Sequence, residues 1–138
     1  MGKVVSLNIS EKRGTEKVQV PSVNVIEKFG IEGDAHAGNW DRQISILPVE
    51  ALERVPSDKI EEVKKGGFTE NITISGIPLN NLGVDSSIRI GEVVIKILYI
   101  GKDKYKEYGR PYIVSREGRF GIVVKGGRIN VGDPVEVI

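Results

Sequence analysis

The chain has 138 residues, of which 39% are hydrophobic and 28% charged, proportions typical of one soluble globular domain. Lys and Arg number 20 and Asp and Glu 19, so the formal charge of +1 is too small for binding nucleic acid through bulk charge. Cysteine is absent, which excludes disulfides, thiolate nucleophiles, persulfide carriers and thiolate metal ligands. We expect residues 1–138 to form a single domain.

The sequence gives no indication of a membrane-bound or exported protein. No apolar run approaches the roughly 18 residues that cross a bilayer. The first residues lead into a strand-like pattern and lack the apolar core of a signal peptide. We therefore predict a cytoplasmic protein, with neither a membrane nor a nucleic acid as its partner.

Alternating apolar residues predict two strands in the first part of the chain. Val4, Val5, Leu7 and Ile9 indicate a first strand, and residues 15–20 alternate with period two, so we expect the two to pair across the turn at 11–14. Pro21 ends the second strand. Residues 22–29 contain apolar side chains without a clean period, and we predict an irregular link there.

The middle of the chain predicts one strand and two short helices. Residues 43–47 form the strand, which ends at Pro48. Proline suits the first turn of a helix, where its missing N–H would have no intrahelical partner, so we expect a helix from Pro48 to about Val55. A second helix is predicted at 59–65, because Ser57 or Asp58 can cap its start and two glycines end it.

The remainder of the chain consists mainly of strand patterns, at residues 71–75, 87–90, 92–100, 120–125, 128–131 and 135–138. Residues 103–109 are charged and predict a helical turn or a loop. Many short strands joined by glycine-rich turns favour a mainly β fold, either a barrel or a sandwich, with the two helices as an insertion.

Residues 30–46 are the densest candidate for a functional site, since they contain the only His, the only Trp and three glycines. Glycine allows a positive φ or close approach to a ligand, so this segment is either a binding loop that presents Asp34 and His36 or a wide turn. A protein-only metal site is disfavoured because there is no second His. A Ser-His-Asp triad using Ser45 or Ser115 is disfavoured because no Gly-x-Ser-x-Gly turn is present.

Two arginines near glycine-rich turns are candidates for binding an anion. Arginine binds phosphate or carboxylate through two parallel hydrogen bonds, which suits Arg42 and Arg116 to this role. The alternative is a pair of structural salt bridges, from Arg42 to Asp41 or Asp34 and from Arg116 to Glu117. The sequence alone favours the salt bridges.

Glu70 and Asn71 lie where a predicted helix stop meets a predicted strand. Their side chains could fix a polar ligand by directional hydrogen bonds, or they could satisfy the backbone of a turn.

Three groups of residues, in this order along nearly the whole chain, together resemble the MOSC domain, named for the C-terminal region of molybdenum cofactor sulfurases. They are Gly30 to Gly38 with Arg42-Gln43-Ile44-Ser45; Gly67-Phe68-Thr69-Glu70-Asn71-Ile72-Thr73 with Gly76 and Leu79; and Arg116-Glu117-Gly118-Arg119-Phe120 with Gly126-Gly127 and Gly132-Asp133. The resemblance implies a single compact β-barrel of the MOSC or pyruvate-kinase-barrel-like type, with two short helices inserted. It agrees with the strand count.

The resemblance also implies a role in handling the molybdenum cofactor, a pterin (molybdopterin) that carries a phosphate and a dithiolene. In the family a Cys just before the Arg-Glu-Gly motif is the proposed sulfur carrier or metal ligand, and Tyr112 stands at that place in this chain. A phenol can neither form a persulfide nor replace a soft thiolate on molybdenum. We therefore expect binding of the cofactor or a related anionic pterin without Cys-based sulfur transfer. Pyridoxal phosphate is not expected, because no lysine motif for it is visible.

Under this hypothesis the two arginines hold the phosphate, and the other polar residues contact the pterin edge. N–H groups of the glycine-rich segment 30–38, the glycine loop, also contribute. The predicted cofactor-binding residues are Asp34, His36, Arg42, Glu70, Asn71 and Arg116.

Two other hypotheses remain open. One is an enzyme that reduces N-hydroxylated compounds together with a molybdoenzyme or a redox partner protein. The other is a non-catalytic interaction barrel, in which tyrosines and lysines form a partner-binding face. Those residues are Tyr99, Tyr105, Tyr108, Tyr112, Lys102, Lys104 and Lys106.

Overall fold

The computed structural model describes residues 1–12, 18–54, 70–101 and 117–138, and most of them form β-strands. The strands are β1 Gly2–Ile9, β2 Val18–Val20, β3 Ser22–Ile26, β4 Gly30–Ile31, β5 Ile44–Pro48, β6 Ile72–Ser75, β7 Ser87–Ile90, β8 Val93–Ile100, β9 Arg119–Lys125, β10 Gly127–Asn130 and β11 Pro134–Val137. Two short 3₁₀ helices, η1 Val49–Arg54 and η2 Leu79–Asn81, complete the described elements. Neither helix has the length and apolar character needed to span a membrane.

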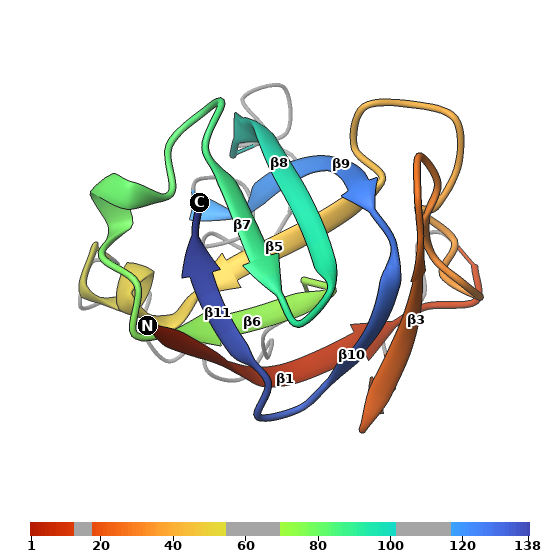
Figure 1. Cartoon of the computed structure of the whole chain (residues 1–138), viewed down its shortest axis with the longest axis horizontal. Helices are drawn as coiled ribbons and strands as arrows, with labels where there is room; N and C mark the ends of the chain where they lie inside the picture. Colours follow the sequence, from red (N-terminus) through yellow and green to blue (C-terminus); the bar gives the residue numbers. More distant parts are fainter. Residues whose placement is uncertain (13–17, 55–69, 102–116) are drawn as a thin grey trace.

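Seven strands close into a barrel in the order β11-β7-β8-β9-β5-β6-β1 (Figure 1). Pairing between β1 and β11 closes the ring, with Gly2 opposite Val135. Neighbouring strands are antiparallel except β5 and β6, which run parallel with Ile46 opposite Ile72. Strand β2 pairs with β1 outside the closed ring.

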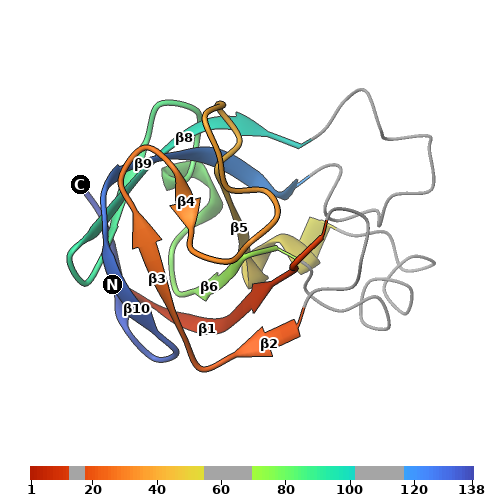
Figure 2. The ribbon, with the colours of Figure 1, turned by 90° about the vertical axis from the view of Figure 1, so that its right-hand side faces the viewer.

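A second sheet of three strands, in the order β10-β3-β4, lies against one side of the barrel (Figure 2). Strand β10 pairs with β3 in an antiparallel register that places Gly127 opposite Val25. Val23, Val25 and Ile129 of this sheet are buried and belong to the same apolar cluster as the barrel interior. The second sheet therefore extends the core, and β4 leads the chain from it toward the glycine loop.

Branched aliphatic side chains fill the barrel. Ile44 and Ile46 of β5 and Ile95 and Ile97 of β8 are at most 1% exposed, and full burial of such a side chain contributes roughly 1.5–3 kcal/mol. All five residues of β5 are buried. Its outward-facing residues, among them Ser45, are thus covered as well, and a polar group there must find a partner inside the protein.

Most strand predictions are confirmed, and the fold is a barrel. The prediction of an irregular link at 22–29 is wrong, because Ser22–Ile26 forms β3. The burial of that strand alternates with period two, but Ile26 and Phe29 are 41% and 40% exposed. Because these two exposed residues are apolar, the sequence of residues 22–29 does not show the apolar–polar alternation that the burial follows.

The helix predicted from Pro48 is only partly confirmed. Pro48 is the last residue of β5, and the six residues that follow form the 3₁₀ helix η1. An isolated segment of this length is too short for a stable α-helix. Within η1 the Glu50 carboxylate accepts the Gly76 N–H at 2.8 Å, which ties η1 to the end of β6. The predictions for residues 59–65 and 103–109 lie outside the described residues.

Candidate functional site

The loop between β4 and β5 is organised around the carboxylate of Asp34, whose side chain is fully buried. Its Oδ1 accepts the Ser10 N–H at 2.9 Å and its Oδ2 accepts the His36 N–H at 3.2 Å. Backbone N–H groups stabilise a buried carboxylate by charge-assisted hydrogen bonds. Asp34 therefore ties the loop to the end of β1.

His36 lies beside this carboxylate and remains partly open to solvent, with 29% of its side chain exposed. Its Nδ1 is 3.7 Å from Oδ2 of Asp34, and it is buried without a hydrogen-bond partner in the part of the chain that the structure describes. The His36 carbonyl accepts the indole N–H of Trp40 at 2.7 Å, which fixes the turn of the loop. An imidazole oriented in this way can hydrogen-bond a ligand or transfer a proton.

Asn71 connects three strands through its buried amide. Its Oδ1 accepts the N–H and the Oγ–H of Ser45, both at 3.0 Å. Its Nδ2 donates to the carbonyl of Asn8 at 3.2 Å, and Nδ2 of Asn8 donates in turn to the carbonyl of Glu70 at 3.1 Å. The end of β1, the start of β5 and the start of β6 are thereby held together.

The end of β1 is therefore the place where four of the six predicted site residues meet. Asn8 and Ser10, one on each side of the last residue of β1, bond to the Glu70–Asn71 segment and to Asp34 respectively. Arg116 lies outside the described residues. The predicted residues that the structure gathers here are Asp34, His36, Glu70 and Asn71.

Arg42 lies over two aromatic rings. Its Cζ is 4.4 Å from the ring centroid of Tyr99 and 4.8 Å from that of Phe120. Tyr99 of β8 is opposite Phe120 of β9, so both side chains leave the same face of the sheet. Phe120 is also opposite Ser45 of β5. The guanidinium therefore lies beside the strand that Asn71 braces.

The salt bridge from Arg42 to Asp41 or Asp34, which the sequence favoured, is not formed. Within residues 1–12, 18–54, 70–101 and 117–138, Arg42 makes no ion pair, and its Nη1 is buried without an acceptor. Asp34 bonds to backbone N–H groups, as described above. The Asp41 carboxylate accepts a hydrogen bond from the phenol of Tyr99 instead.

This hydrogen bond affects the acidity of the phenol. The bond to Asp41, followed by burial and by the charge of Asp41, raises the pKa of Tyr99, and the Arg42 guanidinium opposes the effect. Because the raised pKa belongs to the folded state, protonated Tyr99 contributes stability that is fully present below the pKa of the unfolded chain. That contribution is lost as pH rises through the folded-state pKa.

We expect Asp41→Asn to lower the pKa of Tyr99 toward its ordinary value of 10.0, because the main cause of the increase is removed. The measurement is a pH titration of tyrosine Cζ by NMR, with the Tyr99 signal assigned from a Tyr99→Phe variant. Glu136→Gln is the matched control, since Glu136 is bound to Arg89 on another part of the barrel. Identical Tyr99 titrations in wild type and Asp41→Asn would disprove the bond.

The sequence predictions did not include Tyr99, Phe120 and Asp41 among the site residues, and placed Tyr99 only on a hypothetical partner-binding face. The local signal for Asp41 was its position next to Arg42. Tyr99 and Phe120 carried no such signal, because their proximity depends on the register between β8 and β9.

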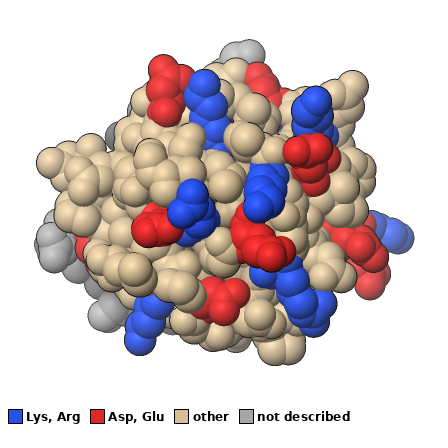
Figure 3. All heavy atoms as spheres, viewed as in Figure 1, with Lys and Arg blue, Asp and Glu red and all other residues tan. Residues whose placement is uncertain are grey.

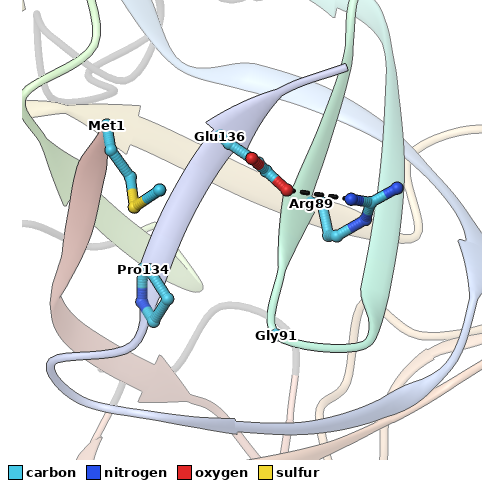
Figure 4. Close-up of a pocket in the computed structure, with 5 residues that line it drawn as sticks. All are labelled: Met1, Arg89, Gly91, Pro134 and Glu136. Atoms are coloured by element: carbon cyan, nitrogen blue, oxygen red, sulfur yellow. Dashed lines mark hydrogen bonds and ion pairs between the residues drawn. The ribbon is translucent and has the colours of Figure 1, made fainter.

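Other parts of the surface offer weaker candidates. A shallow depression near the start of β1 is lined by Met1, Arg89, Gly91, Pro134 and Glu136 (Figure 4). Arg89 and Glu136 form an ion pair at 2.9 Å and neutralise each other there. Acidic and basic side chains are interspersed over this face of the molecule (Figure 3). Among the described residues, no three His, Asp or Glu side chains are close enough to hold a metal ion.

The structure defines a closed β-barrel with a polar loop braced at one end. Residues 33–99, which include most of the loop, η1 and Tyr99, match the family model of the MOSC domain, in agreement with the family resemblance of the sequence motifs.

Solved structures show the same fold. The YuaD protein from Bacillus subtilis is 21% identical with a TM-score of 0.73, and the alignment covers 99% of this chain and 96% of YuaD. YiiM from Escherichia coli is 20% identical with a TM-score of 0.64, with coverage of 99% and 69%. YiiM from Geobacillus stearothermophilus is 18% identical with a TM-score of 0.68, with coverage of 100% and 75%. Comparison with curated proteins gave no match.

Proposed function

We propose that this MOSC domain binds the molybdenum cofactor, or a related anionic pterin, through the wall formed by the glycine loop, the start of β6 and Arg42. The main supporting observation is the environment of Arg42, whose guanidinium lies over two rings while its buried Nη1 has no acceptor among the residues that the structure describes. A buried donor without a partner costs about 1–3 kcal/mol, and more when the group is charged. An anionic group on a ligand would offset this cost.

The other residues suit the rest of such a ligand. Under the proposal Arg42, with Arg116, binds the phosphate. His36, whose Nδ1 has no hydrogen-bond partner among the described residues, contacts the polar edge of the pterin. The buried amide of Asn71 already has three hydrogen bonds, and the Asp34 carboxylate accepts two from described residues. Asp34 and Asn71 would therefore act mainly by fixing the wall that the other residues present.

The bound cofactor would bring the redox and sulfur chemistry of its molybdenum and dithiolene. The chain has no Cys, so it offers neither a thiolate for molybdenum nor a persulfide. The proposal is therefore binding, for storage, delivery or insertion, without Cys-based sulfur transfer.

The test is an anaerobic titration of the purified protein with isolated molybdenum cofactor. Hydrogen bonds to a charged group contribute about 1.5–3 kcal/mol, so we expect Arg42→Ala to weaken binding by roughly 10- to 100-fold. Arg89→Ala is the matched control, since Arg89 is paired with Glu136 and lies near the other end of β1. Equal affinities, or negligible binding, for wild type and Arg42→Ala would contradict the proposal.

A further inference from the structure

We infer that Tyr99 is a positioning residue that keeps Arg42 available for a phosphate group by binding the carboxylate of Asp41. This inference deepens the proposed function and rests on it in one respect, because both take Arg42 as the anion-binding residue. The chemical class of ligand is an oxyanion such as a phosphate monoester, whose oxygens can accept parallel N–H bonds from one guanidinium.

The first step is that the Asp41 carboxylate can compete with a ligand phosphate for the Arg42 guanidinium. Asp41 precedes Arg42 in the sequence, and a carboxylate within reach of a guanidinium normally pairs with it. A ligand phosphate would then have to displace an internal anion. In this structure the Asp41 carboxylate is bound to the phenol of Tyr99, and no ion pair between Asp41 and Arg42 is present among the described residues.

The second step is that the Tyr99 side chain both contacts the Arg42 guanidinium and binds the Asp41 carboxylate. The ring of Tyr99 lies 4.4 Å from the Arg42 Cζ and its hydroxyl donates to Asp41. The Asp41 interactions also raise the pKa of Tyr99, so the phenol remains a protonated donor near neutral pH. Tyr99 therefore supports the guanidinium from one side and holds the competing carboxylate at the same time.

The third step is that these two effects can be separated experimentally. Tyr99→Phe removes the hydroxyl and keeps the ring, and Phe120 still supports the guanidinium at 4.8 Å. Tyr99 is 38% exposed, so the variant leaves no buried cavity. The specific consequence of Tyr99→Phe is that the Asp41 carboxylate is free to turn toward Arg42.

The experiment is a titration with inorganic phosphate, followed by the NMR signals of the arginine side chains, in wild type and four variants. We expect Tyr99→Phe to weaken phosphate binding by about two- to fivefold, the range for a partly exposed ion pair that must be broken. Tyr99→Phe/Asp41→Asn should restore the wild-type affinity or exceed it, because the competing charge is gone. Asp41→Asn alone should bind at least as tightly as wild type, and Arg42→Ala should lose the binding.

Rescue in the double variant separates this role from a purely structural one, since a loss caused by distorted packing would persist without the Asp41 charge. Unchanged affinity in Tyr99→Phe, or a loss that the double variant does not reverse, would overturn the inference. So would equal phosphate binding, or none, in wild type and Arg42→Ala. Phosphate contains no pterin. If the phosphate titrations give the expected affinities but the protein does not bind the molybdenum cofactor, only the proposed function is refuted. If Arg42→Ala loses the cofactor and Tyr99→Phe leaves phosphate binding unchanged, only the inference fails.

Discussion

Replacing Asn71 by Ala is expected to destabilise the protein by about 3 kcal/mol and to lower its Tm by roughly 10 °C. The variant leaves the Ser45 N–H and the Asn8 carbonyl without the partners that the Asn71 amide supplies at 3.0 and 3.2 Å. Asn71 is only 1% exposed, so water does not readily replace the amide. Thermal and urea unfolding followed by circular dichroism measure the loss.

Asn80→Ala is the control for this variant. Asn80 is an exposed residue of η2, and surface substitutions of this kind usually change the stability by less than about 0.5 kcal/mol. If Asn71→Ala unfolds at the same temperature as Asn80→Ala, the amide network does not hold the three strands together. Under the proposed function Asn71→Ala should also weaken cofactor binding, because β5, the strand beside Arg42, loses its hydrogen bonds to the Asn71 amide.

The stability of this network and its place at the site could not be obtained from the sequence alone. Glu70 and Asn71 were candidates because they lie where a strand begins, but the sequence left open whether they bind a ligand or satisfy backbone. The answer depends on a parallel pairing of β5 with β6 and on the end of β1, which are brought together only in the closed barrel. No local pattern encodes such a pairing.

The local parts of the structure were predictable. Strands with one face more buried than the other show period two in the sequence, which is why β7 and β8 were predicted. Closure of the barrel depends on the pairing of β11 with the start of β1. The strand patterns alone therefore left a barrel and a sandwich as alternatives, and only the family resemblance favoured the barrel. The 3₁₀ geometry of η1 was not predicted, because the helix signal at Pro48 does not specify the helix type.

The error at Arg42 has a similar origin. Its neighbour Asp41 made a local salt bridge the favoured interpretation, and Tyr99 changes that outcome only because β8 and β9 place its ring beside Phe120. The competition between Tyr99 and Arg42 for one carboxylate is decided by strand register. This dependence means that a change at the β8–β9 interface should affect both the fold and the anion site.

Gly121→Ala tests that dependence and is expected to cost about 3 kcal/mol, at the upper end of the usual range for overpacking. Gly121 of β9 is opposite Ile97 of β8. A Cβ at this position would overlap the Lys96 carbonyl oxygen and lie 3.2 Å from the Ile97 Cα. Backbone atoms on a central strand cannot move as a flexible side chain does, so β8 must shift away from β9. Unfolding in urea gives the change in free energy.

Gly83→Ala is the matched control, because a Cβ there has no atom within 4 Å. At such a position the substitution is expected to be neutral or to stabilise the protein by up to about 1 kcal/mol, through the lower entropy of the unfolded chain. Gly121→Ala should also weaken phosphate binding, since a shift between β8 and β9 separates Tyr99 from Phe120 under the Arg42 guanidinium. A Gly121→Ala protein with the stability of Gly83→Ala would show that the strands can accommodate the methyl group. Loss of stability with unchanged phosphate affinity would show that the Arg42 site does not depend on the β8–β9 register.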